Sequence, residues 1–128
     1  MTLTYPNELH YTASHEYVAL RDDVAVVGIT AFAVDELGDI TYLELPPVGQ
    51  MVKRGERFGT IESVKAVSDL YAPVSGVVTE VHSELVDAPE RIAEDPYGVG
   101  WLLKMKLTQP EETQELLTAA AYQAQLGG

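Results

Sequence analysis

The 128-residue sequence contains no cysteine, so it has no disulfide, no thiolate nucleophile and no cysteine metal site. Any sulfur chemistry must therefore come from an attached group. Basic residues are also scarce: 8 Lys and Arg stand against 20 Asp and Glu, a formal net charge of −12. A surface this acidic repels phosphate backbones and anionic lipid, so we expect neither nucleic acid nor membrane as a partner.

Long hydrophobic runs are missing as well. The longest mostly apolar stretch, 24–34, is interrupted by Gly28 and Thr30 and falls short of a membrane span. The first twelve residues have neither the pattern of a secretion signal nor that of an Arg-rich presequence. Apolar residues make up 46% and charged residues 22%, as is usual for a globular chain. We expect a single domain over residues 1–128 in a bacterial cytoplasm.

Short segments rich in strand-forming residues alternate with turn residues along most of the chain. Pro46 and Pro47 end one such segment, since proline cannot donate to a strand ladder. This pattern predicts a mainly β sandwich or barrel rather than a parallel sheet. The predicted strands cover residues 17–21, 24–29, 40–45, 51–53, 58–63, 67–72, 76–82 and 101–107.

Helix signals are few. Thr30 is a predicted N-cap for a short helix over 31–37, with Gly38 as its C-terminal stop, and Pro89 is predicted to open one turn over 90–94. A longer C-terminal helix is predicted over about 110–125, beginning at Pro110. The face expected to pack on the β body carries Leu116, Leu117, Ala120, Ala121 and Ala124.

The usual signatures of metal sites and active sites are missing from the sequence. His15-Glu16 resembles the start of a zinc-protease motif, but residue 19 is alanine, and the three histidines lack ligand spacing. No GxxxxGK loop and no Gly-x-Ser-x-Gly elbow occurs. The sequence therefore predicts no metal site and no catalytic residue.

Lys65 is the one residue that stands out. It is one of four lysines and lies between two strand-like runs, TIES and VSDLYA, so we expect it at the exposed tip of a hairpin over about 58–72. No Gly or Asn accompanies it, which favours a type I turn over a primed one. From spacing alone, a solvated lysine that interrupts a sheet edge remains the alternative.

Four blocks of sequence carry a family resemblance. The stretch GTIESVKAVSDLYAPVSGVV, residues 59–78, resembles the lipoyl-lysine hairpin of glycine cleavage system H proteins. YTASHEYV at 11–18, VGITAFAVDELGDITYLELPPVG at 27–49 and DPYGVGW at 95–101 resemble the same family. The blocks occur in order over nearly the whole chain, so the chain is identified as a member of this lipoyl carrier family.

The resemblance implies a barrel-sandwich hybrid, the lipoyl-domain-like fold with two small antiparallel sheets, flanked by short helices and a C-terminal helix. It implies lipoate joined to Lys65 through an amide. Glu62, three residues before the lysine, and Gly76, eleven after it, are the family's recognition positions for the lipoylating enzyme. Val64 and Ala66 flank Lys65, where a biotin carrier usually has methionines.

The function that the resemblance implies is that of a carrier without catalysis of its own. The lipoyl arm takes an aminomethyl group from a pyridoxal-phosphate glycine decarboxylase (P protein), presents it to a tetrahydrofolate-dependent aminomethyltransferase (T protein), and is reoxidised by dihydrolipoyl dehydrogenase (L protein). A lipoyltransferase or lipoate ligase loads it. A shuttle with three partners is expected to be a monomer. The residues expected to form a groove for the arm are Ser14, Glu16, Ile29, Ala33, Ala66 and Asp69.

We hypothesise that Glu16 holds the amine of the loaded arm, because an ammonium buried without a partner is costly. The chain departs from the family's usual residues at Tyr17, Glu36, His82 and the Ala93-Glu94 pair. Two other interpretations stay open: an H-like protein that relays lipoate to other complexes, and an unmodified β-sandwich interaction domain.

Overall fold

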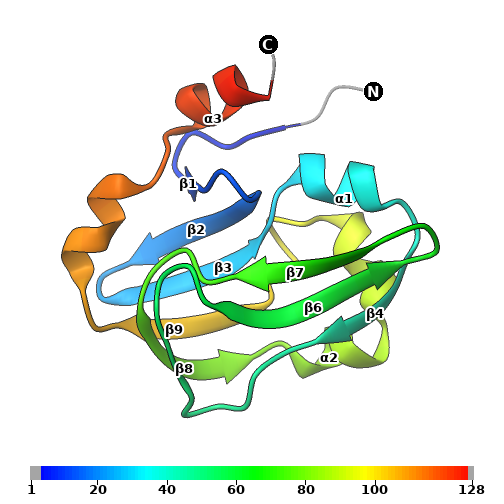
Figure 1. The fold of residues 1–128 in the computed structure, drawn as a ribbon, viewed down its shortest axis with the longest axis horizontal. Helices are drawn as coiled ribbons and strands as arrows, with labels where there is room; N and C mark the ends of the chain where they lie inside the picture. The colour runs from blue at the N-terminus through cyan, green and yellow to red at the C-terminus, as the bar shows by residue number, and fades with distance from the viewer. Residues whose placement is uncertain (1–3, 127–128) are drawn as a thin grey trace.

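Two antiparallel sheets form the body of the protein in a computed structural model, which describes residues 4–126. Figure 1 shows the smaller sheet in front of the larger one. In spatial order, the six-stranded sheet contains β1 (His10–Tyr11), β2 (Glu16–Arg21), β3 (Val24–Ile29), β9 (Leu103–Leu107), β8 (Gly76–Val81) and β5 (Met51–Val52). The three-stranded sheet contains β4 (Ile40–Glu44), β6 (Arg57–Ser63) and β7 (Val67–Tyr71). The predicted mainly β fold is confirmed.

The hydrophobic core lies between the sheets. One cluster of buried side chains joins Val27 and Met105 of the large sheet to Leu43, Ile61 and Leu70 of the small one. Burial alternates with a period of two along β9, whereas β6 is buried continuously from Phe58 to Ile61. The sheets are therefore held face to face by apolar burial, and the β6–β7 hairpin is fixed on that base.

The β2–β3 hairpin turns at Asp22 and Asp23, as predicted, and Asp22 has the left-handed φ of 58° that such a tight turn favours. The pairing runs without interruption from Arg21 opposite Val24 to Glu16 opposite Ile29. This register places Glu16 and Ile29 side by side at the far end of the hairpin.

Helix α1 (Ala31–Leu37) begins and ends where the sequence predicted. The Thr30 side chain accepts a hydrogen bond from the Ala33 amide at 3.2 Å, and Gly38 follows the helix with a φ of 75°. A 3-10 helix, η1 (Pro89–Glu94), opens at the predicted proline. The helix α2 (Ser83–Asp87) was not predicted, since five residues give too short a periodic signal.

The predicted C-terminal helix over 110–125 is wrong as one continuous element. The chain forms a 3-10 helix, η2 (Pro110–Glu115), and then the short helix α3 (Ala119–Gln125). Between them Leu117 pairs with Tyr11 of β1, with amide–carbonyl distances of 2.8 and 2.7 Å. Because this pairing breaks the helix, Thr118 caps α3.

The restart of the helix also changes which of its residues are buried. The expected buried positions Ala120, Ala121 and Ala124 are exposed, and Ala119 and Tyr122 are buried instead. These two join Leu9, Tyr11 and Tyr17 in a second cluster. The C-terminal helix thus packs on β1 and β2 rather than along a single long face.

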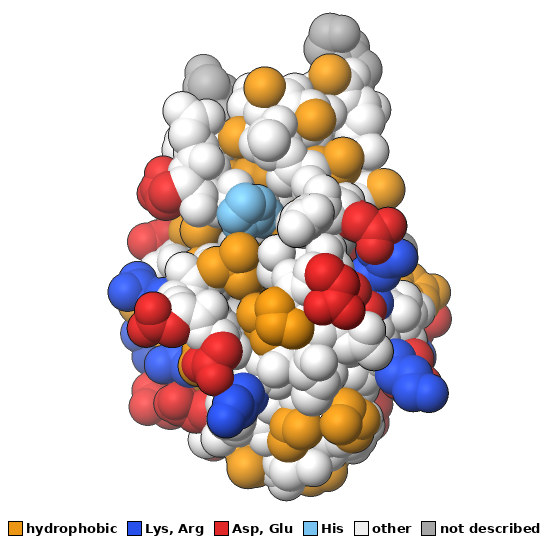
Figure 2. Space-filling view, turned by 90° about the vertical axis from the view of Figure 1, so that its left-hand side faces the viewer, with side chains coloured by type: hydrophobic (Ala, Val, Ile, Leu, Met, Phe, Trp, Pro, Cys, Tyr) orange, Lys and Arg blue, Asp and Glu red, His pale blue; other side chains and the backbone are white. Residues whose placement is uncertain are grey.

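Ion pairs on the surface offset little of the acidic excess. Five of the eight Lys and Arg contact a described carboxylate, and all seven of the pairs that they form are partly exposed. Exposed pairs of this kind contribute at most about 1 kcal/mol each. Figure 2 shows one face where basic side chains mostly lie beside acidic ones and hydrophobic side chains run along the middle. No helix within residues 4–126 is long and apolar enough to cross a membrane.

Candidate functional site

Lys65 lies at the tip of the β6–β7 hairpin, and its side chain is exposed. The Ser63 amide donates to the Ala66 carbonyl at 2.8 Å, which closes the turn. The Ser63 hydroxyl oxygen accepts from the amides of Lys65 and Ala66 at 3.3 and 3.1 Å. No residue of this turn has a positive φ, in agreement with the expectation of an unprimed turn. The lysine is therefore presented on a fixed backbone.

The hairpin tip is also tied to the end of α1. The Val64 amide donates to the Asp39 carbonyl at 3.1 Å, and the Lys65 side chain passes over Gly38, where its Cε would lie 3.6 Å from a Cβ at that position. Val64 and Val67, at 71% and 69% exposed, flank the lysine on both sides. The tip thus combines one amine with an apolar surface that a partner could contact.

A groove of about 420 Å³ opens beside the hairpin, between β7, the β1–β2 turn and α1. All six residues that were expected to form an arm-docking groove line it: Ser14, Glu16, Ile29, Ala33, Ala66 and Asp69. Three residues that were not among the expected set, His15, Phe32 and Glu36, line it as well. Because Ala66 follows Lys65 directly, the groove begins next to the lysine.

Glu16 is the buried polar group of this groove, at 1% exposed. Its Oε1 accepts hydrogen bonds from the hydroxyls of Thr12 at 2.8 Å and Ser14 at 2.5 Å. Its Oε2 accepts from the backbone amide of Tyr71 at 3.3 Å. Burial raises the pKa of Glu16, and these hydrogen bonds oppose the rise. The carboxyl group is therefore held in place, and any cation that reaches it stabilises its charged form.

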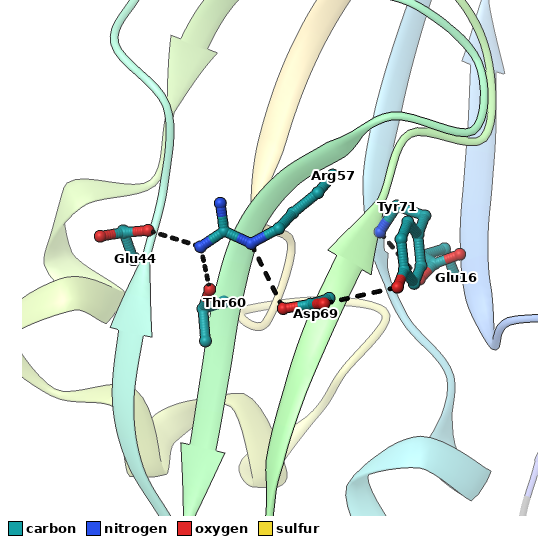
Figure 3. Close-up of polar contacts among 6 residues, drawn as sticks. All are labelled: Glu16, Glu44, Arg57, Thr60, Asp69 and Tyr71. Carbon is teal, nitrogen blue, oxygen red and sulfur yellow. Dashed lines mark hydrogen bonds and ion pairs between the residues drawn. The ribbon is translucent and has the colours of Figure 1, made fainter.

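Tyr71 links Glu16 to a second carboxylate, as Figure 3 shows. β7 is the edge strand of the small sheet, so the Tyr71 amide has no strand partner on its outer side and donates to Glu16 instead. The Tyr71 hydroxyl donates to Asp69 Oδ2 at 3.4 Å. Asp69 Oδ1 accepts from Arg57 Nε at 3.3 Å, and Arg57 also reaches Glu44.

The other wall of the groove depends on the C-terminal helix. The Tyr122 hydroxyl of α3 lies 2.7 Å from His15 Nδ1 and 2.8 Å from the hydroxyl of Thr30, the residue that caps α1. The His15 ring packs against Phe32 of α1, with 4.8 Å between ring centres. Burial lowers the pKa of His15, and Glu36 opposes that shift. His15 has a φ of 76°, an uncommon backbone conformation for a side-chain-bearing residue.

The two recognition positions expected from the family lie apart from the groove. Glu62 is half-buried on β6, opposite Val67, and its carbonyl accepts from the Thr41 hydroxyl at 3.4 Å. Gly76 is buried at the start of β8, where a Cβ would lie 2.5 Å from the Lys106 carbonyl oxygen. A requirement for close strand packing therefore accounts for glycine at this position.

The departure at residue 17 has a structural explanation. Tyr17 is buried, and its hydroxyl donates to the Pro96 carbonyl at 2.7 Å. Its ring covers Gly28 and meets Tyr97 edge-on, with 5.1 Å between ring centres. It packs behind the groove rather than lining it.

Sequence reasoning missed Thr12, Tyr71 and Arg57. Thr12 could have been found from its position two residues before Ser14, at a turn leading into a strand. Tyr71 acts on Glu16 through its backbone, and Arg57 reaches Asp69 only because the strand is irregular, so no side-chain pattern marks either residue.

The groove offers carboxylates and an apolar wall. Glu16, Glu36 and Asp69 line it, and no Lys or Arg within residues 4–126 does. The described residues also contain no cluster of His, Asp and Glu that could hold a metal ion. The site is therefore suited to a cation carried on an apolar stem.

An exposed lysine on a rigid hairpin of two packed antiparallel sheets defines the class of lipoyl-domain-like carrier modules. The family profile described as Glycine cleavage H-protein matches residues 9–127 of the chain. The chain therefore belongs to the glycine cleavage H-protein family.

Individual relatives agree. The chain is 56% identical over 128 residues to a glycine cleavage system H protein of Cyanothece sp. (strain PCC 7425 / ATCC 29141), covering 100% of this chain and 99% of that one. It is 57% identical over 129 residues to one from Thermosynechococcus vestitus, with the same coverage. The crystal structure of a glycine cleavage system H protein from Mycobacterium marinum matches with a TM-score of 0.90 and 45% identity, covering 97% of this chain and 100% of that one.

Proposed function

We propose that this chain is the lipoyl carrier of a glycine cleavage system, a carrier component rather than an enzyme, with lipoate joined through an amide to Lys65. The observation that carries the proposal is the position of Lys65, exposed on a hydrogen-bonded hairpin tip beside a groove. From ordinary bond lengths, lysine and lipoyl chain form an arm on the order of 14 Å. Such a tether keeps its end at high effective concentration near the groove and near a docked enzyme.

The groove fits such an arm in size and in chemistry. Its volume of about 420 Å³ is within the usual range for small-ligand sites. Ile29, Ala33 and Leu37 supply an apolar wall, and Glu16 and Asp69 supply acceptors. When attached, lipoate provides the reactive sulfur that a cysteine-free chain lacks.

The protein's own part is to hold the amine of the aminomethyl cargo and to keep water from it. Glu16 is the residue we assign to the ammonium, because its Oε2 accepts one hydrogen bond from the described residues, that of the Tyr71 amide, and retains accepting capacity. A charge-assisted hydrogen bond to a buried carboxylate is stronger than a neutral one. Ser14 and Asp69 also line the groove and complete the set of acceptors.

The proposed partners are those of the system. Glycine decarboxylase supplies the cargo, the aminomethyltransferase receives it, and dihydrolipoyl dehydrogenase reoxidises the arm. The acidic surface suits brief docking onto basic patches of these enzymes. A lipoyltransferase or lipoate ligase attaches the arm, with Glu62 and Gly76 as recognition positions. Gly76 contributes through the close packing of β8 on β9.

We further propose that the chain acts as a single-domain monomer in the bacterial cytoplasm. The support for one domain is a core cluster that takes side chains from both sheets. The support for a bacterial setting is that the relatives named above come from bacteria. Light scattering of the purified chain tests the monomer.

The first experiment measures the intact mass of the chain after incubation with lipoate, ATP and a lipoate ligase. We expect a gain of one lipoyl group in the wild type and none in Lys65→Arg, which keeps the charge and removes the acylated amine. A second lipoyl domain in the same tube controls for ligase activity. If the control is modified and the wild type is not, the carrier function is refuted and an unmodified interaction domain takes its place.

The second experiment separates glycine cleavage from lipoate relay. The lipoylated chain is combined with the decarboxylase, the aminomethyltransferase and tetrahydrofolate, and release of carbon dioxide from glycine is measured. A carrier of glycine cleavage supports release, whereas a pure relay does not. Glu16→Gln is the matched groove variant: we expect its loaded form to release formaldehyde faster than the wild type. An equal rate removes Glu16 from the amine-holding role.

A further inference from the structure

Asp69 is the groove carboxylate with a charged partner. Arg57 Nε lies 3.3 Å from Asp69 Oδ1, and the same guanidinium lies 3.2 Å from Glu44. The side chains of Arg57 and Asp69 are about half exposed, at 50% and 48%. Figure 3 shows Asp69 between Arg57 on one side and Tyr71 and Glu16 on the other. Asp69 therefore contacts Arg57 on the outer face of the small sheet and also lines the groove.

The backbone of strand β6 brings Arg57 to the face of the sheet that carries Asp69. Glu44, Thr60 and Asp69 lie in one row across the three strands of the small sheet. Arg57 is three residues before Thr60, and strict alternation would place the two side chains on opposite faces. A bulge between Arg57 and Gly59 restores Arg57 to the face of Thr60, whose hydroxyl it contacts at 2.5 Å.

The residue at this bulge, Gly59, is a glycine for a steric reason. A side chain at Gly59 would collide with the carbonyl oxygen of Glu44, so the close approach of β4 requires glycine there. The backbone geometry of β6 therefore determines the face of the sheet on which the Arg57 guanidinium lies.

We propose that Arg57 is a positioning residue that competes with the ammonium of the loaded arm for Asp69, and so limits how tightly the groove holds its cargo. The inference rests on the proposed function, since it assigns a role to one more residue of the same groove. The Arg57 guanidinium belongs to the protein and lies beside Asp69 whether or not the arm is loaded, whereas the ammonium arrives only with the cargo. Because Asp69 is paired with Arg57, it attracts the ammonium in the groove less strongly. A docked enzyme can therefore withdraw the arm.

Competition and a purely structural role predict opposite changes in arm docking when Arg57 is lost. If Arg57 only supported the sheet, its loss would loosen Asp69 and weaken docking of the arm. If it competes, its loss strengthens docking. For a half-exposed pair the expected change in the docking equilibrium is about two- to fivefold.

A stable cationic arm tests this without turnover. The lipoylated chain is reduced and its arm is S-aminoethylated, which places an ammonium at the end of a thioether that does not hydrolyse. A matched arm with a neutral S-hydroxyethyl group is the control. Docking is measured from the NMR shift of the Tyr71 amide, which donates to Glu16 in the groove. The variants are Arg57→Gln, Arg57→Lys, Asp69→Asn and the double variant R57Q/D69N.

We expect Arg57→Gln to increase docking of the cationic arm and to leave docking of the neutral arm unchanged, with Arg57→Lys close to the wild type. In the Asp69→Asn background the effect of Arg57→Gln should disappear. Weaker or unchanged docking in Arg57→Gln, or an equal change with the neutral arm, overturns the inference. Glu16→Gln distinguishes failure of this inference from failure of the proposed function. If it leaves docking of the cationic arm unaltered, the proposed amine-holding role of the groove is refuted instead.

Discussion

The Tyr122 hydroxyl joins the C-terminal helix to two of the elements that frame the groove. It hydrogen-bonds His15 in the β1–β2 turn and Thr30 at the start of α1, at 2.7 and 2.8 Å. Burial raises the pKa of Tyr122 to about 12, so the hydroxyl carries its proton at neutral pH. The substitution Tyr122→Phe removes this oxygen and keeps the ring, which stacks on Tyr11 with 5.0 Å between ring centres.

The size of the effect follows from what is left behind. Thr30 is fully buried, so its hydroxyl loses a partner that water cannot readily replace, while half-buried His15 can be rehydrated. Losing two hydrogen bonds of this kind costs about 1–3 kcal/mol. An unfolding entropy of about 2.1 cal/mol/K per residue gives about 0.27 kcal/mol per degree for 128 residues. We therefore expect the Tm to fall by about 4–11 °C.

Urea unfolding and thermal melting at neutral pH measure this change. Tyr5→Phe is the matched control, because Tyr5 packs edge-on against the Tyr122 ring at 5.5 Å and its hydroxyl makes no hydrogen bond with a residue that the structure describes. We expect the control to unfold close to the wild type. A loss below about 0.5 kcal/mol in Tyr122→Phe, or an equal loss in Tyr5→Phe, refutes the argument that these two hydrogen bonds fasten the helix.

Two further predictions concern pH and packing. Burial raises the pKa of Glu16 in the folded chain, so the folded state keeps this proton to higher pH than the unfolded state does. The free energy of unfolding therefore falls as pH rises from the ordinary carboxyl range through the folded pKa, and Glu16→Gln should flatten that part of the profile in urea unfolding. Identical profiles would contradict the raised pKa. At Gly76, an alanine Cβ would meet the Lys106 carbonyl oxygen at 2.5 Å and Met105 Sδ at 3.1 Å. Gly76→Ala should cost about 1–3 kcal/mol by chemical denaturation, and an unchanged midpoint would show that β8 can move away from β9.

The sequence by itself determined the local elements and singled out Lys65. Segments rich in strand-forming residues, bounded by turn residues, located the main strands to within one or two residues. Thr30 and Gly38 fixed the ends of α1, since capping and a positive φ are local requirements. The resemblance of the four sequence blocks was enough to predict Lys65 at the tip of its hairpin and to name six of the residues that line the groove.

The tertiary structure alone decided which segments meet. The sequence order of the strands does not show that β9 inserts between β3 and β8. Leu117 leaves its predicted helix because it pairs with Tyr11, and that contact outweighs a helical propensity that is weak by comparison. The link from Arg57 through Asp69 and Tyr71 to Glu16 likewise depends on a bulge and an edge-strand amide. Such contacts join residues far apart in the chain, and local periodicity contains no information about them.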